Sequence, residues 1–142
     1  NKFRDNFRIY PVKGYSITID LDDEISKNAA PHVSIKDDHN KIVSSRLGNR
    51  LRVAGTAELA GENKEVREER ITPLIEWVNN CFPEVNTKNI ITWAGLRPMT
   101  SDMVPIMRES KRKNVFYNSG HGHLGWTMGA FAGKFISDLI ED

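Results

Sequence analysis

The amino-acid sequence predicts an α+β fold, in which an antiparallel sheet with one packed helix is followed by further strands and a long C-terminal helix. Apolar and polar residues alternate over residues 12–21 and 50–59, a pattern typical of half-buried strands. Over residues 64–82 and 123–140, apolar residues recur at helical spacing instead. This change of period separates the predicted sheet from the predicted helices.

Two shorter strands are predicted at residues 32–36 and 41–46, on either side of the turn-forming residues DDHN. The links between the four N-terminal strands are short and polar. We therefore expect a meandering antiparallel sheet, in which each strand pairs with the next one along the chain.

The helix predicted over residues 64–82 has one apolar face, formed by Ile71, Leu74, Ile75, Val78 and Phe82. Pro73 lies within this segment and cannot donate a backbone hydrogen bond. Two arrangements remain open: Pro73 kinks the helix, or it lies in the first turn of a second helix that Thr72 caps.

Three more strands are predicted at residues 89–97, 103–107 and 114–119, before the final helix at 123–140. The apolar side of that helix consists of Leu124, Met128, Phe131, Phe135 and Leu139. Gly125, Gly129 and Gly133 recur at every fourth position, although each glycine in a helix interior costs about 1 kcal/mol relative to alanine. They indicate either close packing on a sheet or the approach of the helix start to a flat ligand.

Composition excludes several classes of protein. The 142 residues carry a net charge of +1, with 39% hydrophobic and 27% charged residues, so no electrostatic footprint for nucleic acid is present. Cys81 is the single cysteine, which excludes an internal disulfide. The first residue is Asn1 and the opening segment reads as the middle of a chain, so we expect a fragment of a longer protein.

Residues 118–135 place His121 and His123 among glycines. A metal site is disfavoured because no Cys, Asp or Glu stands nearby to complete a ligand shell. A hydrolase pair of Ser119 and His121 lacks the G-x-S-x-G spacing. Gly120 and Gly122 permit unusual backbone geometry, so we expect a loop pressed against a ligand at a helix N-terminus.

Arg97 lies at the end of a predicted apolar strand and precedes Pro98, which cannot donate to a sheet ladder. A guanidinium that emerges from a buried strand is unfavourable unless it is paired, and its planar fork suits a carboxylate or a phosphate. Arg97 therefore either binds an anionic ligand or forms a structural ion pair, for which Asp102 is the local candidate.

Four blocks in this order resemble the C-terminal portion of FAD-dependent D-amino-acid dehydrogenases of the small-subunit type, within the D-amino-acid oxidase superfamily. These blocks are PVKGYSITI, RLRVAGTAELAG, WAGLRPMTSDMVPIM and NVFYNSGHGHLGWTMGAFAGKFISDLI. The resemblance implies a fragment of a larger two-domain flavoenzyme. Residues 1–92 would be the antiparallel substrate-binding portion, and residues 93–142 would supply the C-terminal strands and long helix of the FAD-binding domain.

The resemblance also implies an activity and its site. A D-amino acid, alanine-sized at the level of the family, would lose its α-hydrogen as hydride to FAD, and the imine would hydrolyse to a 2-oxo acid and ammonia. Arg97 would bind the substrate carboxylate, with His123 as a second substrate-side residue, and no catalytic base is assigned. The loop along the isoalloxazine ring would consist of Gly120, His121, Gly122, His123, Leu124, Gly125, Trp126 and Thr127.

The implied partners are the remaining N-terminal part of the flavoenzyme and a quinone or other respiratory-chain acceptor. The implied location is the cytoplasm, with peripheral attachment to the inner face of a bacterial membrane as an alternative. The phosphate-binding G-x-G-x-x-G unit at the start of a β-α-β segment is absent, so we expect the fragment to be inactive alone. Two other functions remain open: a glycine- or sarcosine-type amine oxidase, and a non-catalytic, partner-binding remnant of a split gene.

Overall fold

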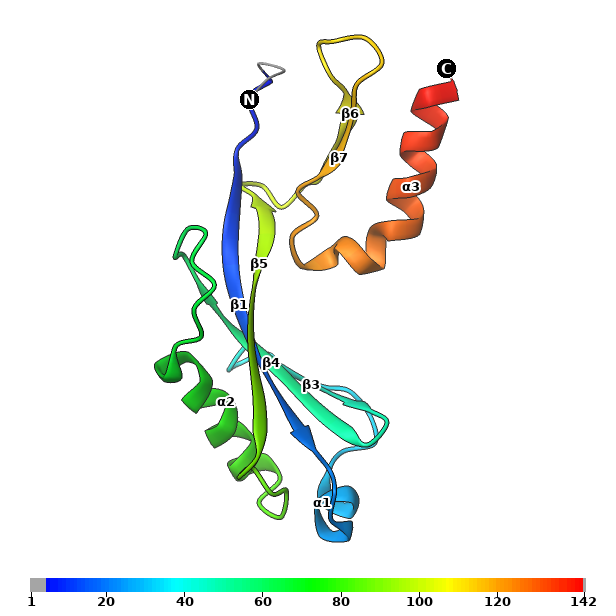
Figure 1. Cartoon of the computed structure of the whole chain (residues 1–142). Coiled ribbons are helices and arrows are strands. Elements are labelled where there is room, and N and C mark those ends of the chain that lie inside the picture. Colours follow the sequence, from blue (N-terminus) through cyan, green and yellow to red (C-terminus); the bar gives the residue numbers. More distant parts are fainter. Residues whose placement is uncertain (1–4, 142) are drawn as a thin grey trace. The chain divides into compact units, whose positions relative to one another are not determined.

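The computed structural model describes residues 5–141 of the chain and confirms the α+β fold (Figure 1). The elements in chain order are β1 (Ile9–Asp20), α1 (Glu24–Ala29), β2 (Ile35–Asp37), β3 (Ile42–Leu47), β4 (Arg50–Glu58), α2 (Glu68–Cys81), β5 (Ile90–Thr100), β6 (Ile106–Glu109), β7 (Phe116–Ser119), the short 3-10 helix η1 (Gly122–Leu124) and α3 (Gly125–Glu141).

The chain divides into two compact units. One unit runs from Lys13 to Leu96 and contains α1, α2 and most of a five-stranded sheet. The other unit combines the residues up to Val12 with those from Arg97 onward, and it contains the antiparallel hairpin β6–β7 and the long helix α3. Strands β1 and β5 contribute residues to both units.

The strand order of the large sheet is β2-β3-β4-β1-β5, so the predicted simple meander is wrong for β1. Only β2, β3 and β4 follow one another as neighbours, whereas β1 pairs with β4 in the interior of the sheet. The reason is burial, because all residues from Lys13 to Ile17 are buried, as is usual for a central strand.

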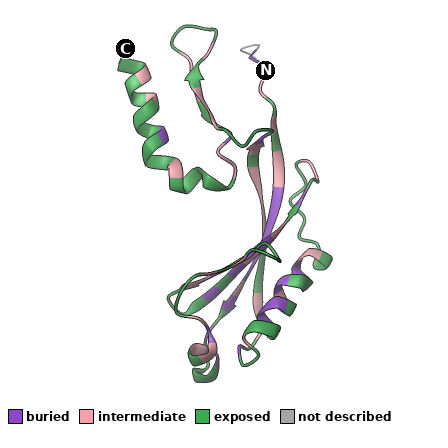
Figure 2. Ribbon diagram, turned by 180° about the vertical axis from the view of Figure 1, so that it is seen from behind, coloured by how far each residue is buried: buried purple, intermediate pink, exposed green. Residues whose placement is uncertain are grey.

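Helix α2 lies along one face of this sheet and closes the core of the unit (Figure 2). Of the predicted apolar face, Ile71, Leu74 and Val78 are buried, while Ile75 and Phe82 pack partly against the core. The core also contains Tyr15, Ile17, Ile19, Leu21, Ala30, Ile42, Leu51, Val53, Trp77 and Val85. The sheet and helix therefore share one apolar interior.

Helix α2 is one continuous element through Pro73. Thr72 lies inside the helix, and its hydroxyl donates to the carbonyl of Glu68 at 3.0 Å, so the expectation of a second helix capped by Thr72 is wrong. Helix α1 was not predicted, because six residues are too few to show a period. Its sequence signal is Asp23, whose carboxylate accepts from the backbone N–H of Ser26 at 2.7 Å.

Strand β5 continues through Pro98 to Thr100, beyond the predicted end at residue 97. Pro98 is tolerated because β5 is an edge strand, where a missing backbone donor need not break the ladder between two strands. Arg97 therefore lies inside a strand and not at its end.

A bulge in β4 changes which side chains face the core. Tyr15 pairs with Gly55 and Gly14 pairs with Ala57, so Thr56 is an extra residue in β4, with a positive φ of 54°. Before the bulge the odd-numbered residues of β4 face the core, and after it Glu58 does. The bulge thus buries a carboxylate that regular alternation would expose.

Glu58 is the centre of a buried polar cluster that was not predicted from the sequence. Its carboxylate lies 3.2 Å from Nζ of Lys13, accepts a hydrogen bond from the hydroxyl of Tyr15, and lies 2.7 Å from a guanidinium nitrogen of Arg67. Lys13 is fully buried and also donates to the carbonyl of Glu65 at 2.8 Å. The cluster therefore ties the segment before α2 to β1 and β4.

These contacts shift both buried charges toward their ionised forms. The hydrogen bond from Tyr15, followed by those from Lys13, holds the pKa of Glu58 below its ordinary value. The hydroxyl of Tyr15 and the carboxylate of Glu58 raise the pKa of Lys13. Glu58 thus contributes stability above its ordinary pKa, and Lys13 contributes stability below its own.

Replacement of Leu74 by alanine tests the α2 contact. Leu74 is fully buried, so we expect Leu74→Ala to lower the free energy of unfolding by about 2–5 kcal/mol. Urea unfolding followed by circular dichroism measures this change. The matched control is Leu59→Ala, because Leu59 is 75% exposed and its loss should change stability by less than about 0.5 kcal/mol. Equal effects of the two replacements would contradict the assigned core.

Replacement of Glu58 by glutamine tests the polar cluster. Stability from Glu58 is fully present above its ordinary pKa of 4.5 and is lost as the pH falls through and below that value. We expect Glu58→Gln to lower the urea midpoint at about pH 7 and to flatten its decline toward about pH 3. Glu62→Gln, at an exposed position, serves as the control. An unchanged pH dependence in Glu58→Gln would show that the cluster does not stabilise the fold.

Candidate functional site

The loop between β7 and α3 is held against the end of β5 by two glycines. Gly120 and Gly122 have positive φ values of 80° and 55°, which glycine adopts without strain. A Cβ atom at Gly120 would lie 2.8 Å from Cγ2 of Thr100, and one at Gly122 would lie 2.5 Å from Sδ of Met99. The positive φ therefore favours glycine at both positions, and a side chain at either one would displace Thr100 or Met99.

A backbone bridge between Met99 and His121 fixes this approach. Arg97 precedes Met99 by two residues on β5, so the bridge attaches the predicted flavin loop to the strand that carries the predicted carboxylate-binding residue. Met99 and Thr100, on which the loop packs, were not predicted as site residues. Nothing in their residue types indicates this contact, which depends on the fold.

Arg97 is half-buried in β5. Its local candidate partner, Asp102, is exposed and accepts a hydrogen bond from the backbone N–H of Val104 at 3.1 Å. Residues two apart along a strand face the same side, so Arg97 and Met99 are neighbours on one face of β5. Met99 is the residue that pairs with the loop.

The two histidines of the loop differ in environment. His123 lies in η1 and is exposed. His121 is half-buried, and its Nε2 atom is buried without a hydrogen-bond partner among the described residues. Buried polar atoms are normally hydrogen-bonded, so this nitrogen is suited to a polar atom supplied from outside the chain.

Of the remaining residues of the predicted loop, Leu124 ends η1, and Gly125, Trp126 and Thr127 begin α3. Leu124, Gly125, Trp126 and Thr127 are all exposed, and Trp126 is 98% exposed. Two features tie these residues to the loop: the backbone N–H of Leu124 donates to the carbonyl of His121 at 3.0 Å, and a Cβ atom at Gly125 would lie 3.4 Å from Cβ of His121. The helix N-terminus and its first side chains are therefore open to an external group.

The unit that carries this loop is organised around an N-terminal carboxylate. Asp5 is buried and accepts hydrogen bonds from the hydroxyls of Ser110 and Tyr117. The ring of Phe7 packs edge-on against Tyr117 at a centroid distance of 4.3 Å. The hydrogen bond from Ser110, followed by that from Tyr117, lowers the pKa of Asp5. These contacts hold the N-terminal segment on the hairpin that precedes the loop.

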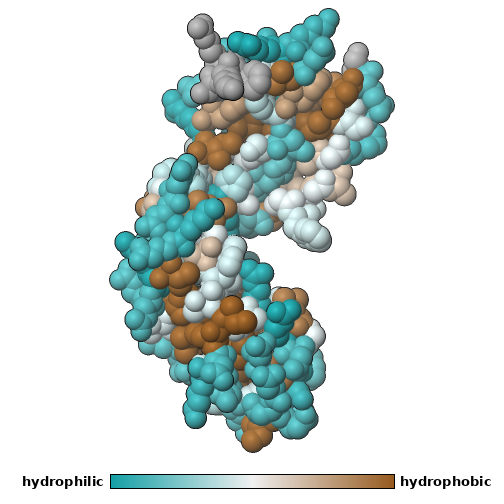
Figure 3. All heavy atoms as spheres, viewed as in Figure 1, coloured by the Kyte–Doolittle hydropathy of each residue, from teal (hydrophilic) through white to brown (hydrophobic). Residues whose placement is uncertain are grey.

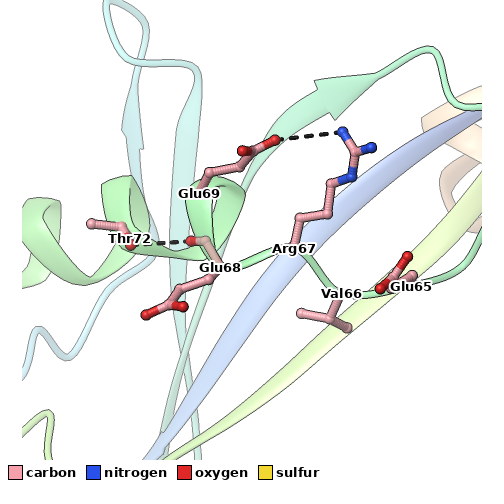
Figure 4. A pocket seen from close by; sticks show the side chains of 6 residues that line it. All are labelled: Glu65, Val66, Arg67, Glu68, Glu69 and Thr72. Atoms are coloured by element: carbon pink, nitrogen blue, oxygen red, sulfur yellow. Dashed lines mark hydrogen bonds and ion pairs between the residues drawn. The ribbon is translucent and has the colours of Figure 1, made fainter.

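A surface pocket in the other unit contains none of the predicted site residues (Figure 4). Its lining consists of Glu65, Val66, Arg67, Glu68, Glu69 and Thr72. The guanidinium of Arg67 lies 3.4 Å from Glu69, and that arginine also binds the buried Glu58. Within the pocket, Arg67 is thus engaged with Glu69, and the hydroxyl of Thr72 with the carbonyl of Glu68.

The structure describes residues 5–141. No group of three or more His, Cys, Asp or Glu side chains lies close enough to hold a metal ion within this range. None of the helices described is both long enough and apolar enough to cross a membrane.

The chain is similar in sequence to known proteins over nearly its whole length. Residues 1–139 match the model of the DAO family, described as FAD dependent oxidoreductase. The chain is 52% identical over 139 residues to D-amino acid dehydrogenase 3 of Mesorhizobium japonicum, covering 97% of this chain and 34% of that protein. It is 47% identical over 134 residues to D-amino acid dehydrogenase of Granulibacter bethesdensis, covering 94% and 31%. The chain thus spans about a third of the length of these relatives.

Solved structures of flavoenzymes share the fold. Glycine oxidase from Bacillus cereus aligns with a TM-score of 0.81 at 27% identity, over 99% of this chain and 38% of that protein. Iminodiacetate oxidase from Chelativorans sp. BNC1 aligns with a TM-score of 0.82 at 23% identity, over 96% and 37%. The family match covers nearly the whole chain, and the fold agrees with it. The chain is a member of the FAD dependent oxidoreductase family.

Proposed function

We propose that this chain is part of an enzyme that oxidatively deaminates D-amino acids to 2-oxo acids and ammonia by hydride transfer to FAD. The observation that carries the proposal is the glycine loop bridged to β5, the strand that bears Arg97, in a chain 52% identical to a D-amino acid dehydrogenase. Residues 1–92 serve the substrate side, and residues 93–142 serve the flavin side.

The loop residues fit a flat flavin ring. Gly120 and Gly122 keep the backbone free of side chains, and His121 carries a buried nitrogen without a partner among the described residues. The residues that hold the isoalloxazine ring are Gly120, His121, Gly122, His123, Leu124, Gly125, Trp126 and Thr127. Bound FAD supplies the hydride acceptor. Backbone N–H groups at the start of α3 stabilise negative charge that develops beside them.

Arg97 binds the substrate carboxylate, because its planar guanidinium can form two parallel hydrogen bonds with it. His123, exposed in η1, is a second substrate-side residue. Both side chains orient and bind the substrate, and neither accepts a proton in the reaction. Hydride transfer from a neutral amine requires no catalytic base in this chain.

The complete enzyme contains further parts and partners. The remaining N-terminal part supplies the phosphate-binding G-x-G-x-x-G unit, and the 142-residue chain alone is inactive. Electrons pass to a quinone or another respiratory-chain acceptor. The enzyme acts in the cytoplasm, with peripheral attachment to the inner face of the bacterial membrane as the alternative.

Glycine oxidase activity is the second candidate function, because the chain shares 27% identity with the glycine oxidase from Bacillus cereus. The two functions differ in the electron acceptor. Rapid oxygen consumption with glycine would favour the oxidase, and dye-linked oxidation of a D-amino-acid panel without oxygen consumption would favour the dehydrogenase.

The role of Arg97 can be tested in a chimera, in which this chain replaces the matching third of the Mesorhizobium relative. We expect Arg97→Lys to raise the apparent KM for D-alanine by about tenfold or more, because lysine cannot form the bidentate contact. Steady-state assays with an artificial electron acceptor measure the change. Arg50→Lys, at an exposed position, is the matched control. Unchanged kinetics in Arg97→Lys would assign Arg97 to a structural ion pair instead.

The isolated chain can be tested for flavin. We expect the purified 142-residue protein to contain less than about 0.1 equivalent of FAD, because it lacks the phosphate-binding unit that supplies much of the affinity. Absorbance at flavin wavelengths relative to protein concentration measures the content. The chimera described above should be yellow and serves as the positive control. Stoichiometric flavin in the isolated chain would show that these residues suffice to bind FAD.

A further inference from the structure

Helix α3 is apolar over a wider arc than its contacts in this chain require. It packs against β6 and β7 through a central row of residues, formed by Met128, Ala132, Ile136 and Leu139. Ala132 is the buried member of this row, and the other three are half-buried. A helix that faces one layer needs one such stripe, and its other faces are normally polar.

Met128 and Ala132 of this row are each followed by a glycine, Gly129 and Gly133. Gly129 and Gly133 are one turn apart, and a Cβ atom built at either position would have no heavy atom within 4 Å. Trp126 and Ile140 lie on the same side of the helix, and they are 98% and 59% exposed. We call these four residues the glycine face of α3. Figure 3 shows apolar surface, in brown, within the unit that contains this helix.

Apolar side chains also lie on the opposite side of the central row. Phe131 and Phe135 are 58% and 37% exposed, and their rings lie 6.1 Å apart. The polar residues Lys134 and Asp138 pair with each other and mark the solvent side. The central row, the glycine face and the two phenylalanines form three adjacent apolar rows. Such a wide apolar arc is typical of a helix buried between two layers, and the hairpin β6–β7 provides only one layer.

We infer that the glycine face of α3 receives a helix from the part of the flavoenzyme that lies outside this chain. Residues without side chains at i and i+4 form a groove along one of the ridge directions of a helix, which lets a second helix approach to about 8 Å between axes. The chain matches 34% of its Mesorhizobium relative, so that relative carries a larger part that is available for this contact. The inference rests on the proposed function, since it identifies the partner as the rest of that enzyme.

The opposite effects of one substitution on folding and on association provide the test. Among the described residues, no side chain or neighbouring strand lies within 4 Å of a Cβ atom built at Gly129 or Gly133, and leucine is a better helix former than glycine. The variant Gly129→Leu/Gly133→Leu should therefore unfold at the same temperature as the wild type or at a higher one. The same side chains would fill the groove and prevent a close approach of the second helix.

Association is measured by co-expression of the 142-residue chain with the part of the Mesorhizobium dehydrogenase that this chain does not match. Affinity capture and analytical ultracentrifugation report the complex. We expect the leucine variant to lose at least about tenfold in affinity, as for the centre of an interface. The control Ala130→Leu adds the same side chain at an exposed position next to the glycine face, and we expect a change of less than about twofold.

Several results would overturn the inference. These are the absence of a complex with the wild-type chain, full binding by the leucine variant, equal losses in Ala130→Leu, or a dimer of the wild-type chain that the leucines abolish. Assays of D-amino-acid oxidation in the chimera are separate. A complex without that activity would contradict the proposed substrate while leaving the docking surface intact.

Discussion

The backbone bridge between Met99 and His121 is the constraint on which the proposed site depends. It exists because Gly120 and Gly122 can adopt positive φ and because neither carries a Cβ atom to collide with β5. The loop consequently packs closely on β5, and the N-terminus of α3 is left exposed. This is a suitable surface for a flat ring, and the strand that holds it also carries Arg97.

The unit from Lys13 to Leu96 contains a buried polar cluster centred on Glu58. The bulge at Thr56 turns Glu58 inward, where it neutralises the fully buried Lys13 and binds Arg67 ahead of α2. A buried ion pair adds little net stability, but the loss of one partner is strongly destabilising. The cluster therefore fixes the connection between β4 and α2 more than it strengthens the fold.

The long helices α2 and α3 differ in how much of their apolar surface is buried by the rest of the chain. The apolar face of α2 is buried against the sheet, whereas α3 leaves Trp126, Phe131 and two glycines in solvent. A chain that spans about a third of its relatives is consistent with this contrast. The unit from Lys13 to Leu96 buries the apolar face of its helix, and the other unit leaves apolar residues of α3 exposed.

The sequence by itself determined the fold class, most strands, both long helices and the family, because these depend on local periodicity and on ordered motifs. The tertiary structure alone decided the rest. Only it placed β1 inside the sheet, carried β5 through Pro98 as an edge strand, and buried Glu58 through a bulge. The pairing of Met99 with His121 joins positions that are distant along the chain, and residue types cannot encode such a contact without the fold.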